Sequence, residues 1–122
     1  MKSIHRKSLG QLGESIAASF LEAHGYSIVK RNIRTPYGEV DIIAVWEEEV
    51  VFVEVKTRAS AALGPPEISI TPRKEQHMRD SAMYYIQQHP EITADWRIDL
   101  ITVQIKGENF PPIIDHFENV IH

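Results

Sequence analysis

Apolar and polar positions repeat with two different periods along the chain, and each change of period marks the boundary of a predicted element. Over residues 8–24, apolar side chains recur at spacings of three and four, which predicts a helix. Gly25 follows as its expected C-terminal cap. The main apolar stripe of this helix consists of Leu9, Leu12, Ile16, Phe20 and Ala23, and a neighbouring stripe consists of Gly10, Glu14, Ala17 and Leu21.

The small residues of the second stripe indicate that the helix approaches a sheet closely. Glu14 is the one charged residue in that stripe. A charge at such a position is either paired or functional, or it lies at the edge of the buried face and reaches water. The helical pattern alone leaves these alternatives open.

Runs rich in β-branched and aromatic residues predict strands in the next part of the chain. The first strand is expected over residues 26–33 and is followed by a turn at 34–37 that contains Pro36. Two further runs, residues 40–46 and 50–56, are separated only by a short acidic break at residues 47–48, and they predict a hairpin.

The second half of the chain predicts a helix between strands. Thr71 and Pro72 have the positions of an N-cap and a first-turn proline, and they open a helix that runs to about residue 88. Strands are expected over residues 97–105 and 113–116. A strand, a helix and another strand imply a right-handed crossover to a parallel neighbour. The chain is therefore predicted to be α/β, with the order α-β-β-β-α-β-β and helices packed on a mixed sheet.

Charged residues interrupt the apolar hairpin at three positions, Asp41, Glu54 and Lys56. With a loop of two or four residues, Asp41 lies directly opposite Glu54 and shares its face, and Lys56 points the same way. A loop of three residues would separate the two acids. Opposed carboxylates repel, so this spacing predicts a divalent cation, Mg²⁺ or Mn²⁺, between them. The alternative is a solvated outer face with an ordinary surface lysine.

Composition bounds the remaining possibilities. The 122 residues suffice for one domain, and the absence of cysteine excludes disulfides, thiol catalysis and cysteine-based zinc sites. A transmembrane run and a signal peptide are both missing from the pattern, so we expect a cytoplasmic protein. The net charge of −4 argues against nucleic-acid binding. Its distribution weakens that argument: residues 1–34 hold six basic and two acidic residues, for +4, and the rest carry −8.

An aspartate followed after twelve residues by Glu-x-Lys resembles the motif of the PD-(D/E)XK nucleases, which have the restriction-endonuclease-like fold. The wider pattern resembles the poorly characterised YraN-type bacterial family, which is similar in core pattern to archaeal Holliday-junction resolvases. Val40 stands where the superfamily name places proline. The resemblance covers residues 8–121, and the following segments carry it: Gly13-Glu14, Arg31-Asn32, Gly38 to Asp41, Phe52 to Arg58, Lys74 and Arg97 to Asp99.

This resemblance implies a metal-dependent endonuclease acting on DNA, and it allows branched DNA and a homodimer. Asp41 and Glu54 would hold one or two Mg²⁺ ions, supported by Glu14 and the backbone carbonyl of Val55, and Lys56 would act on the attacking water or the developing charge. A catalytically silent nucleic-acid-binding module and a protein-interaction domain are the alternatives.

Other residues are expected around this site. Lys30, Arg31 and Arg34 form a basic cluster that could follow a DNA backbone, and Arg58 and Lys74 could also contact phosphates. Glu39 and Asp99 are candidates for supporting acids, although hydrogen bonding within the fold is the preferred role of Asp99. We expect residues 1–7 to be a basic lead, residues 57–70 to be a long connection beside the site, and residues 117–122 to be a tail.

Overall fold

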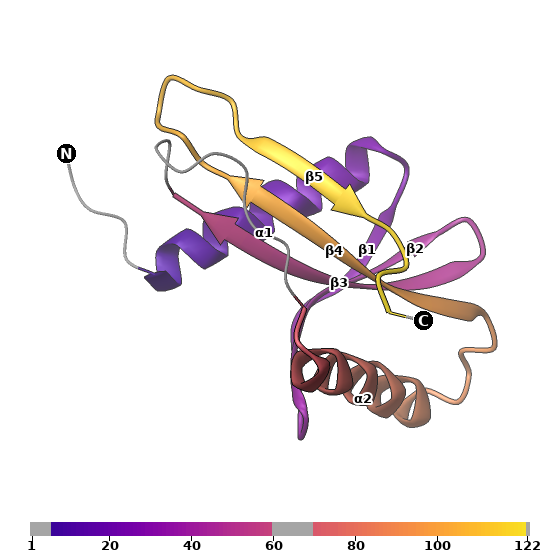
Figure 1. Ribbon diagram of the computed structural model, residues 1–122. Helices are drawn as coiled ribbons and strands as arrows, with labels where there is room; N and C mark the ends of the chain where they lie inside the picture. Colours follow the sequence, from indigo (N-terminus) through magenta and orange to yellow (C-terminus); the bar gives the residue numbers. More distant parts are fainter. Residues whose placement is uncertain (1–5, 60–69, 122) are drawn as a thin grey trace.

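One five-stranded mixed sheet carries a helix on each of its faces (Figure 1). The structure is a computed structural model that describes residues 6–59 and 70–121, and within the first helix it leaves the side chains of Arg6 and Lys7 undescribed. Most of the predicted basic lead, residues 60–69 of the predicted connection and the last residue of the tail lie outside the described residues. The elements are α1 (Arg6–Ala23), β1 (Ser27–Thr35), β2 (Gly38–Trp46), β3 (Glu49–Arg58), α2 (Pro72–Gln88), β4 (Asp95–Gln104) and β5 (Ile113–Phe117).

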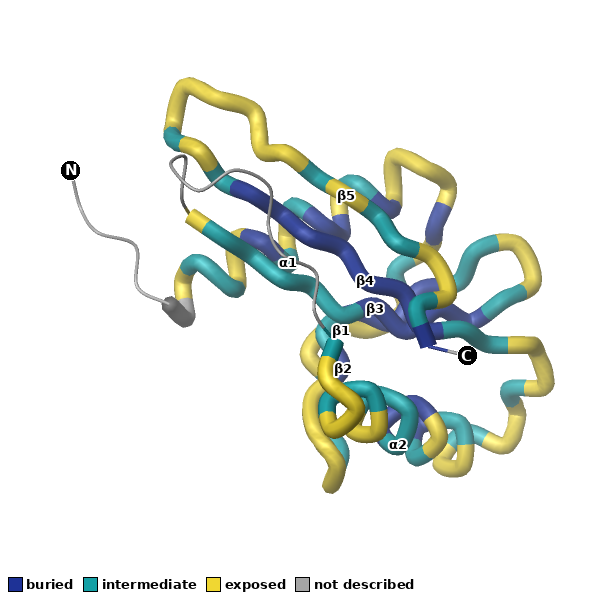
Figure 2. Tube along the Cα trace, viewed as in Figure 1, coloured by how far each residue is buried: buried dark blue, intermediate teal, exposed yellow. Residues whose placement is uncertain are grey.

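The order α-β-β-β-α-β-β is confirmed, and so is the α/β class. Strands lie in the sheet in chain order, and β3 and β4 form the one parallel pair, as the crossover through α2 requires. Burial is concentrated in these central strands, and the edge strand β5 is more exposed (Figure 2). None of the helices in the described part of the chain is long and apolar enough to span a membrane.

Alternation along the central strands separates two cores. Val51 and Val53 pack under α1 together with Ile101 and Val103 of β4. Phe52 points to the other face, where it joins the core beneath α2. The prediction that odd and even residues of β3 point to opposite faces is therefore confirmed.

Two helix ends follow the predicted local chemistry. Gly25 has φ +91°, and the N–H groups of Gly25 and Tyr26 donate to the carbonyls of Glu22 and Leu21, which is the Schellman arrangement. The Thr71 side chain accepts a hydrogen bond from the Lys74 N–H, so it caps α2 as expected. Helix α1 begins at Arg6, two residues before its predicted start.

The small-residue stripe of α1 faces the sheet, as its composition indicated. Ala17 and Leu21 of this stripe are fully buried, whereas Leu12 of the main apolar stripe is 41% exposed. The reason is steric: at Gly13 the helix approaches Thr57 of β3 so closely that no side chain fits between them. Close approach turns the small-residue stripe, and with it Glu14, towards the sheet.

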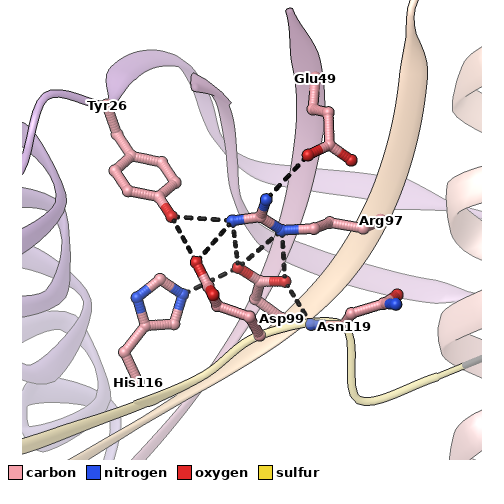
Figure 3. Close-up of polar contacts among 7 residues, drawn as sticks. Tyr26, Glu49, Arg97, Asp99, His116 and Asn119 are labelled. Carbon is pink, nitrogen blue, oxygen red and sulfur yellow. Dashed lines mark hydrogen bonds and ion pairs between the residues drawn. The ribbon is translucent and has the colours of Figure 1, made fainter. Parts of the chain in front are cut away.

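An ionic network centred on the buried Asp99 joins β3, β4, β5 and the residues next to β1 and β5 on the α1 face (Figure 3). Asp99 is fully buried; its carboxylate accepts from Arg97 Nε at 3.0 Å and from the Asn119 N–H at 2.8 Å, and it lies 2.8 Å from His116 Nε2. Arg97 also pairs with Glu49 at 3.0 Å and donates to the Tyr26 hydroxyl at 2.8 Å. Asp99 thus makes hydrogen bonds within the fold, the role that the sequence favoured, and it contacts the Arg97 side chain.

The hydrogen bonds of the network control the charge of Asp99. Burial by itself raises the pKa of this carboxyl, but the hydrogen bonds from His116, Arg97 and the Asn119 backbone outweigh burial and lower the pKa below its usual value. Asp99 is therefore ionised at neutral pH. Its stabilising effect is present above the unfolded-state pKa and disappears as the pH falls through the lower folded-state pKa.

Gly13→Ala should destabilise the protein by about 1–3 kcal/mol, since the added methyl group would overlap Thr57 Oγ1 and lie 2.7 Å from its Cγ2 atom. Gly10→Ala in the same helix is the matched control, because nothing lies within 4 Å of the added atom, and it should stabilise the helix by up to about 1 kcal/mol. Urea denaturation measures both changes. Equal effects of the two substitutions would contradict the close approach of α1.

Asp99→Asn should cost about 3 kcal/mol or more, because it leaves the Arg97 guanidinium, which is 10% exposed, without its fully buried carboxylate partner. The exposed Asp115→Asn on β5 is the control and should change the free energy of unfolding by less than about 0.5 kcal/mol. Urea denaturation at pH 7 compares them. A loss below about 1 kcal/mol at Asp99 would show that the network contributes little.

Candidate functional site

The β2–β3 hairpin has the predicted register and then opens. Ile42 opposes Val53 and Trp46 opposes Glu49 across a two-residue loop, as expected. Regular pairing stops at Ile42 and Val53. The prediction that Asp41 opposes Glu54 in the ladder is therefore wrong. The Oδ2 atom of Asp41 instead accepts a hydrogen bond from the Val55 N–H at 2.8 Å. The carboxylate thus replaces the backbone of β2 as the partner of β3.

A distortion of the neighbouring strands accompanies this opening. Asn32 of β1 lies between the ladder pairs Arg31–Ile42 and Ile33–Val40, and its φ is +55°. Strict alternation would place Val40 and Ile42 on the same face, but Val40 packs in the α2 core and Ile42 in the α1 core. The alternation of side chains along β2 is therefore interrupted at Asp41. As a result, the Asp41 side chain points along the sheet towards Val55.

Four carboxylates converge on this point. Burial, reinforced by the negative charge of Glu54, raises the pKa of Asp41 to about 8, with smaller contributions in the same direction from Glu14 and Glu39. The hydrogen bond from Val55 opposes the shift but does not cancel it. These acids come from α1, β2 and β3, and the fold brings Glu14, Glu39, Asp41 and Glu54 close enough to influence one another.

Glu14 approaches the site from the helix. Its Oε1 atom is buried and has no hydrogen-bond partner among the described residues. Burial and the charge of Glu39 raise the pKa of Glu14, while Arg31 and a hydrogen bond with Asn32 oppose the shift. A buried carboxylate oxygen without a partner is unfavourable unless it binds something. The structure thus favours the functional interpretation of this charge over a glutamate that reaches water.

Two lysines lie beside Glu54. Lys74, in the first turn of α2, places its Nζ atom 3.2 Å from Glu54 Oε1. Burial and the neighbouring ammonium of Lys74 lower the pKa of Lys56, and Glu54 only partly opposes this shift. Both cations therefore belong to the same group as the acids, and α2 contributes to the site from the opposite side of the sheet to α1.

The predicted basic cluster is not a single surface. Lys30 lies 5.9 Å above the Tyr85 ring of α2, whereas Arg31 donates to Ser15 of α1 at 3.1 Å. They occupy opposite faces because successive strand residues point in opposite directions. Arg34 is exposed opposite Glu39, and Arg58 ends β3. The expectation that Lys30, Arg31 and Arg34 form one patch is corrected accordingly.

Asp99 does not join the acids of the hairpin. Its partners Arg97 and His116 lie with it on the α1 face, and Asp99 and Glu54 point to opposite sides of the sheet. Among the described residues, the one group of three possible metal ligands within 4.8 Å of one another is Asp99, His116 and Glu118. The Arg97 guanidinium already contacts both acids of this group, so it supplies the positive charge there.

Tyr37, Arg73 and His77 were not among the predicted site residues, but they line a cleft of about 400 Å³ that Glu54 and Lys74 also line. The cleft lies between the tip of the β1–β2 hairpin and the first turns of α2. Arg73 and His77 are four residues apart in α2, whose N-cap was predicted, so the sequence does place them on the same side of this helix. What could not be predicted is that the hairpin tip lies opposite them.

Comparison with known proteins assigns the chain to a family. It matches the model of the Uncharacterised protein family UPF0102 over residues 13–103. It is 40% identical over 117 residues to a UPF0102 protein of Geobacter metallireducens, covering 96% of this chain and 94% of that relative. It is 43% identical over 101 residues to a UPF0102 protein of Dehalococcoides mccartyi, covering 83% of this chain and 84% of that relative.

A solved structure is also similar, described as the structure of Pyrococcus furiosus SfsA in complex with Ca²⁺. The match covers 95% of this chain and 63% of that chain, with 18% identity and a TM-score of 0.36, a level that carries no argument about function. The family match and the curated relatives lead to one conclusion: the chain belongs to the uncharacterised protein family UPF0102, which confirms its resemblance to the YraN-type family.

Proposed function

We propose that this protein hydrolyses phosphodiester bonds of DNA with a divalent metal ion, Mg²⁺ or Mn²⁺, held at the open end of the β2–β3 hairpin. The convergence of Asp41, Glu54 and Glu14 from three elements supports this proposal most strongly. Burial and the charges of Glu54 and Glu14 raise the pKa of Asp41, and burial, Glu39 and Glu54 raise the pKa of Glu14, so ionisation of Asp41 and Glu14 is opposed in the metal-free protein. Perturbed acids gathered at one point are a signature of functional sites.

The residues present fit such an ion. Asp41, Glu54 and Glu14 would hold it through carboxylate oxygens, the ligands that Mg²⁺ and Mn²⁺ prefer. Glu14 Oε1 lacks another partner among the described residues. The Val55 carbonyl is a further candidate ligand: the N–H and C=O of one strand residue point to the same edge, and the Val55 N–H points to Asp41. A bound ion would bind the scissile phosphate and lower the pKa of an attacking water.

The lysines have distinct roles in this proposal. Lys56, whose pKa is lowered, would orient the attacking water or stabilise charge that develops on the phosphate. Lys74 would exchange its ion pair with Glu54 for one with a DNA phosphate. Glu39 would raise the negative potential of the site without direct coordination. Branched DNA presents two symmetric strands, so a homodimer belongs to the proposal.

A catalytically silent nucleic-acid-binding module is the second candidate. The ion pair between Lys74 and Glu54 favours it, because an ammonium that stayed on this carboxylate would compete with a metal ion. The net charge of −4 favours a protein-interaction domain instead. Metal dependence distinguishes these functions, since neither alternative requires a divalent ion.

Asp41→Asn, Glu54→Gln and Lys56→Met should each lower the rate of DNA cleavage by at least about 100-fold, because the first two remove carboxylate ligands of the proposed ion and the third removes the cation that acts on the attacking water or the phosphate. Cleavage of labelled linear, flap and four-way-junction DNA is measured with Mg²⁺, with Mn²⁺ and with EDTA. Glu48→Gln is the control: it removes an acid from the exposed turn of the same hairpin and should leave the rate unchanged. Parental rates in the three site variants, or cleavage in EDTA, would overturn the proposal.

Asp41→Asn should also change the response of stability to pH and metal. The pKa of Asp41 is raised from 3.8 to about 8, so the folded state binds the extra proton between these values and parental stability falls as the pH rises through that window. The variant lacks this dependence. Mn²⁺ at ten times its Kd should add roughly 1.4 kcal/mol to the parent, or about 3–8 °C in Tm, and little to the variant.

Thermal melts at pH 5 and pH 8, with EDTA and with millimolar Mn²⁺ at constant ionic strength, measure both effects. Without metal, the stability of the variant relative to that of the parent should increase from pH 5 to pH 8. A variant that keeps the full Mn²⁺ shift would place the ion elsewhere, and parallel pH profiles would contradict the shifted pKa of Asp41.

A further inference from the structure

The cleft beside Glu54 has a fixed wall at the tip of the β1–β2 hairpin. Thr35 Oγ1 lies 3.0 Å from the hydroxyl of Ser81, a residue of α2 that is 2% exposed, and Thr35 Oγ1 also accepts from the Tyr37 N–H at 3.1 Å. Gly38 follows with φ +142° and passes close to Ser81. These contacts attach the tip to α2, so the position of Tyr37 is set before any ligand binds.

Tyr37 presents its ring beside the cleft. The residue is 49% exposed, which is high for an aromatic side chain whose backbone is held in place. Its ring meets that of Tyr84 at 6.3 Å and 67°, an edge-type contact that leaves one ring face available. An exposed, pre-positioned aromatic face is suited to stacking against another flat ring.

The opposite wall carries positive charge. Arg73 and His77 are exposed on one side of α2, and within residues 6–59 and 70–121 neither has a hydrogen bond or an ion pair. Lys74, between them in sequence, reaches Glu54 at the inner end of the cleft. The cleft thus runs from the proposed catalytic acids, past an arginine and a histidine without partners among these residues, to an aromatic ring.

We propose that this cleft binds one unpaired nucleotide of the DNA strand, adjacent to the phosphate that is cut. The phosphate of this nucleotide contacts Arg73 and His77, and its base stacks on Tyr37. This inference rests on the proposed function, because it takes Glu54 as the position of the reacting phosphate. It assigns a binding site to a part of the substrate, the neighbouring nucleotide, that the acids of the hairpin do not contact.

The size and chemistry of the cleft select an unpaired nucleotide. Its volume of about 400 Å³ is near the lower end of the range for small-molecule pockets, which suits one nucleotide and excludes a duplex. A base inside a duplex has both faces covered by its neighbours and must leave the stack before it can contact Tyr37. Stacking on an aromatic ring accepts any base, so recognition here depends on strand structure and not on sequence.

A substrate preference follows. DNA with an unpaired nucleotide beside the cut, as in a flap, a splayed strand or a single strand, should bind better than a continuous duplex. The proposed branched substrate is therefore recognised through its unpaired nucleotides, at a position one nucleotide away from the hairpin acids.

Fluorescence anisotropy with a labelled twelve-nucleotide thymidine strand and a blunt twelve-base-pair duplex, both in EDTA to prevent cleavage, tests this inference. Tyr37→Ala should weaken single-strand binding by about 5- to 150-fold and leave duplex binding unchanged. Tyr37→Phe retains the ring and should bind as the parent does. Arg73→Ala should weaken single-strand binding and reduce its dependence on salt concentration, and His77→Ala should weaken single-strand binding.

Arg79→Ala is the matched control, because it removes a cation from the same helix where the side chain pairs with Glu75 outside the cleft. Thermal melts confirm that each variant is folded. Parental single-strand affinity of Tyr37→Ala, or equal losses for Tyr37→Ala and Tyr37→Phe, would overturn the inference.

The same experiment separates this inference from the proposed function. A parent that cuts DNA with Mn²⁺, together with a Tyr37→Ala variant that binds and cuts equally well, would overturn the nucleotide site alone. Single-strand binding that depends on Tyr37 without any cleavage would support the nucleotide site and overturn hydrolysis. A parent that neither binds nor cuts DNA would overturn both.

Discussion

The hydrogen bond from the Val55 N–H to Asp41 Oδ2 is the interaction on which the candidate site depends. It lies where the β2–β3 ladder ends, and it substitutes a carboxylate for the next backbone acceptor. One consequence is that β2 can leave β3 without an unpaired N–H group at Val55. The other is that the Asp41 carboxylate is held near Glu54, whose charge raises the pKa of Asp41.

The two helices contribute to this site in different ways. Helix α1 packs through small residues, and its approach at Gly13 carries Glu14 towards the sheet with one carboxylate oxygen lacking a partner among the described residues. Helix α2 brings Lys74 to Glu54 and holds the β1–β2 hairpin tip through Ser81. The site therefore lies where both layers meet the open hairpin, and neither helix alone would complete it.

Charge is distributed differently on the two faces of the sheet. On the α1 face, Asp99 is fully buried but surrounded by donors from Arg97, His116 and Asn119, so its charge is compensated within the protein. At the open hairpin, Asp41 has one backbone donor and three acidic neighbours, and its pKa rises to about 8. A fully compensated acid stabilises the fold, whereas an under-compensated one is available for a ligand.

The sequence by itself determined the elements and their order, and it identified Asp41, Glu54 and Lys56 as charges within an apolar hairpin. These features depend on local periodicity and caps, which are properties of neighbouring residues. Tertiary structure alone decided that Asp41 bonds to Val55 instead of facing Glu54 across a ladder, because the opening of the hairpin depends on how β1 and both helices pack. It also turned Leu12 outwards, separated Lys30 from Arg31, and placed Tyr37 opposite Arg73. Each of these outcomes joins residues distant in sequence, and no local pattern specifies such a contact.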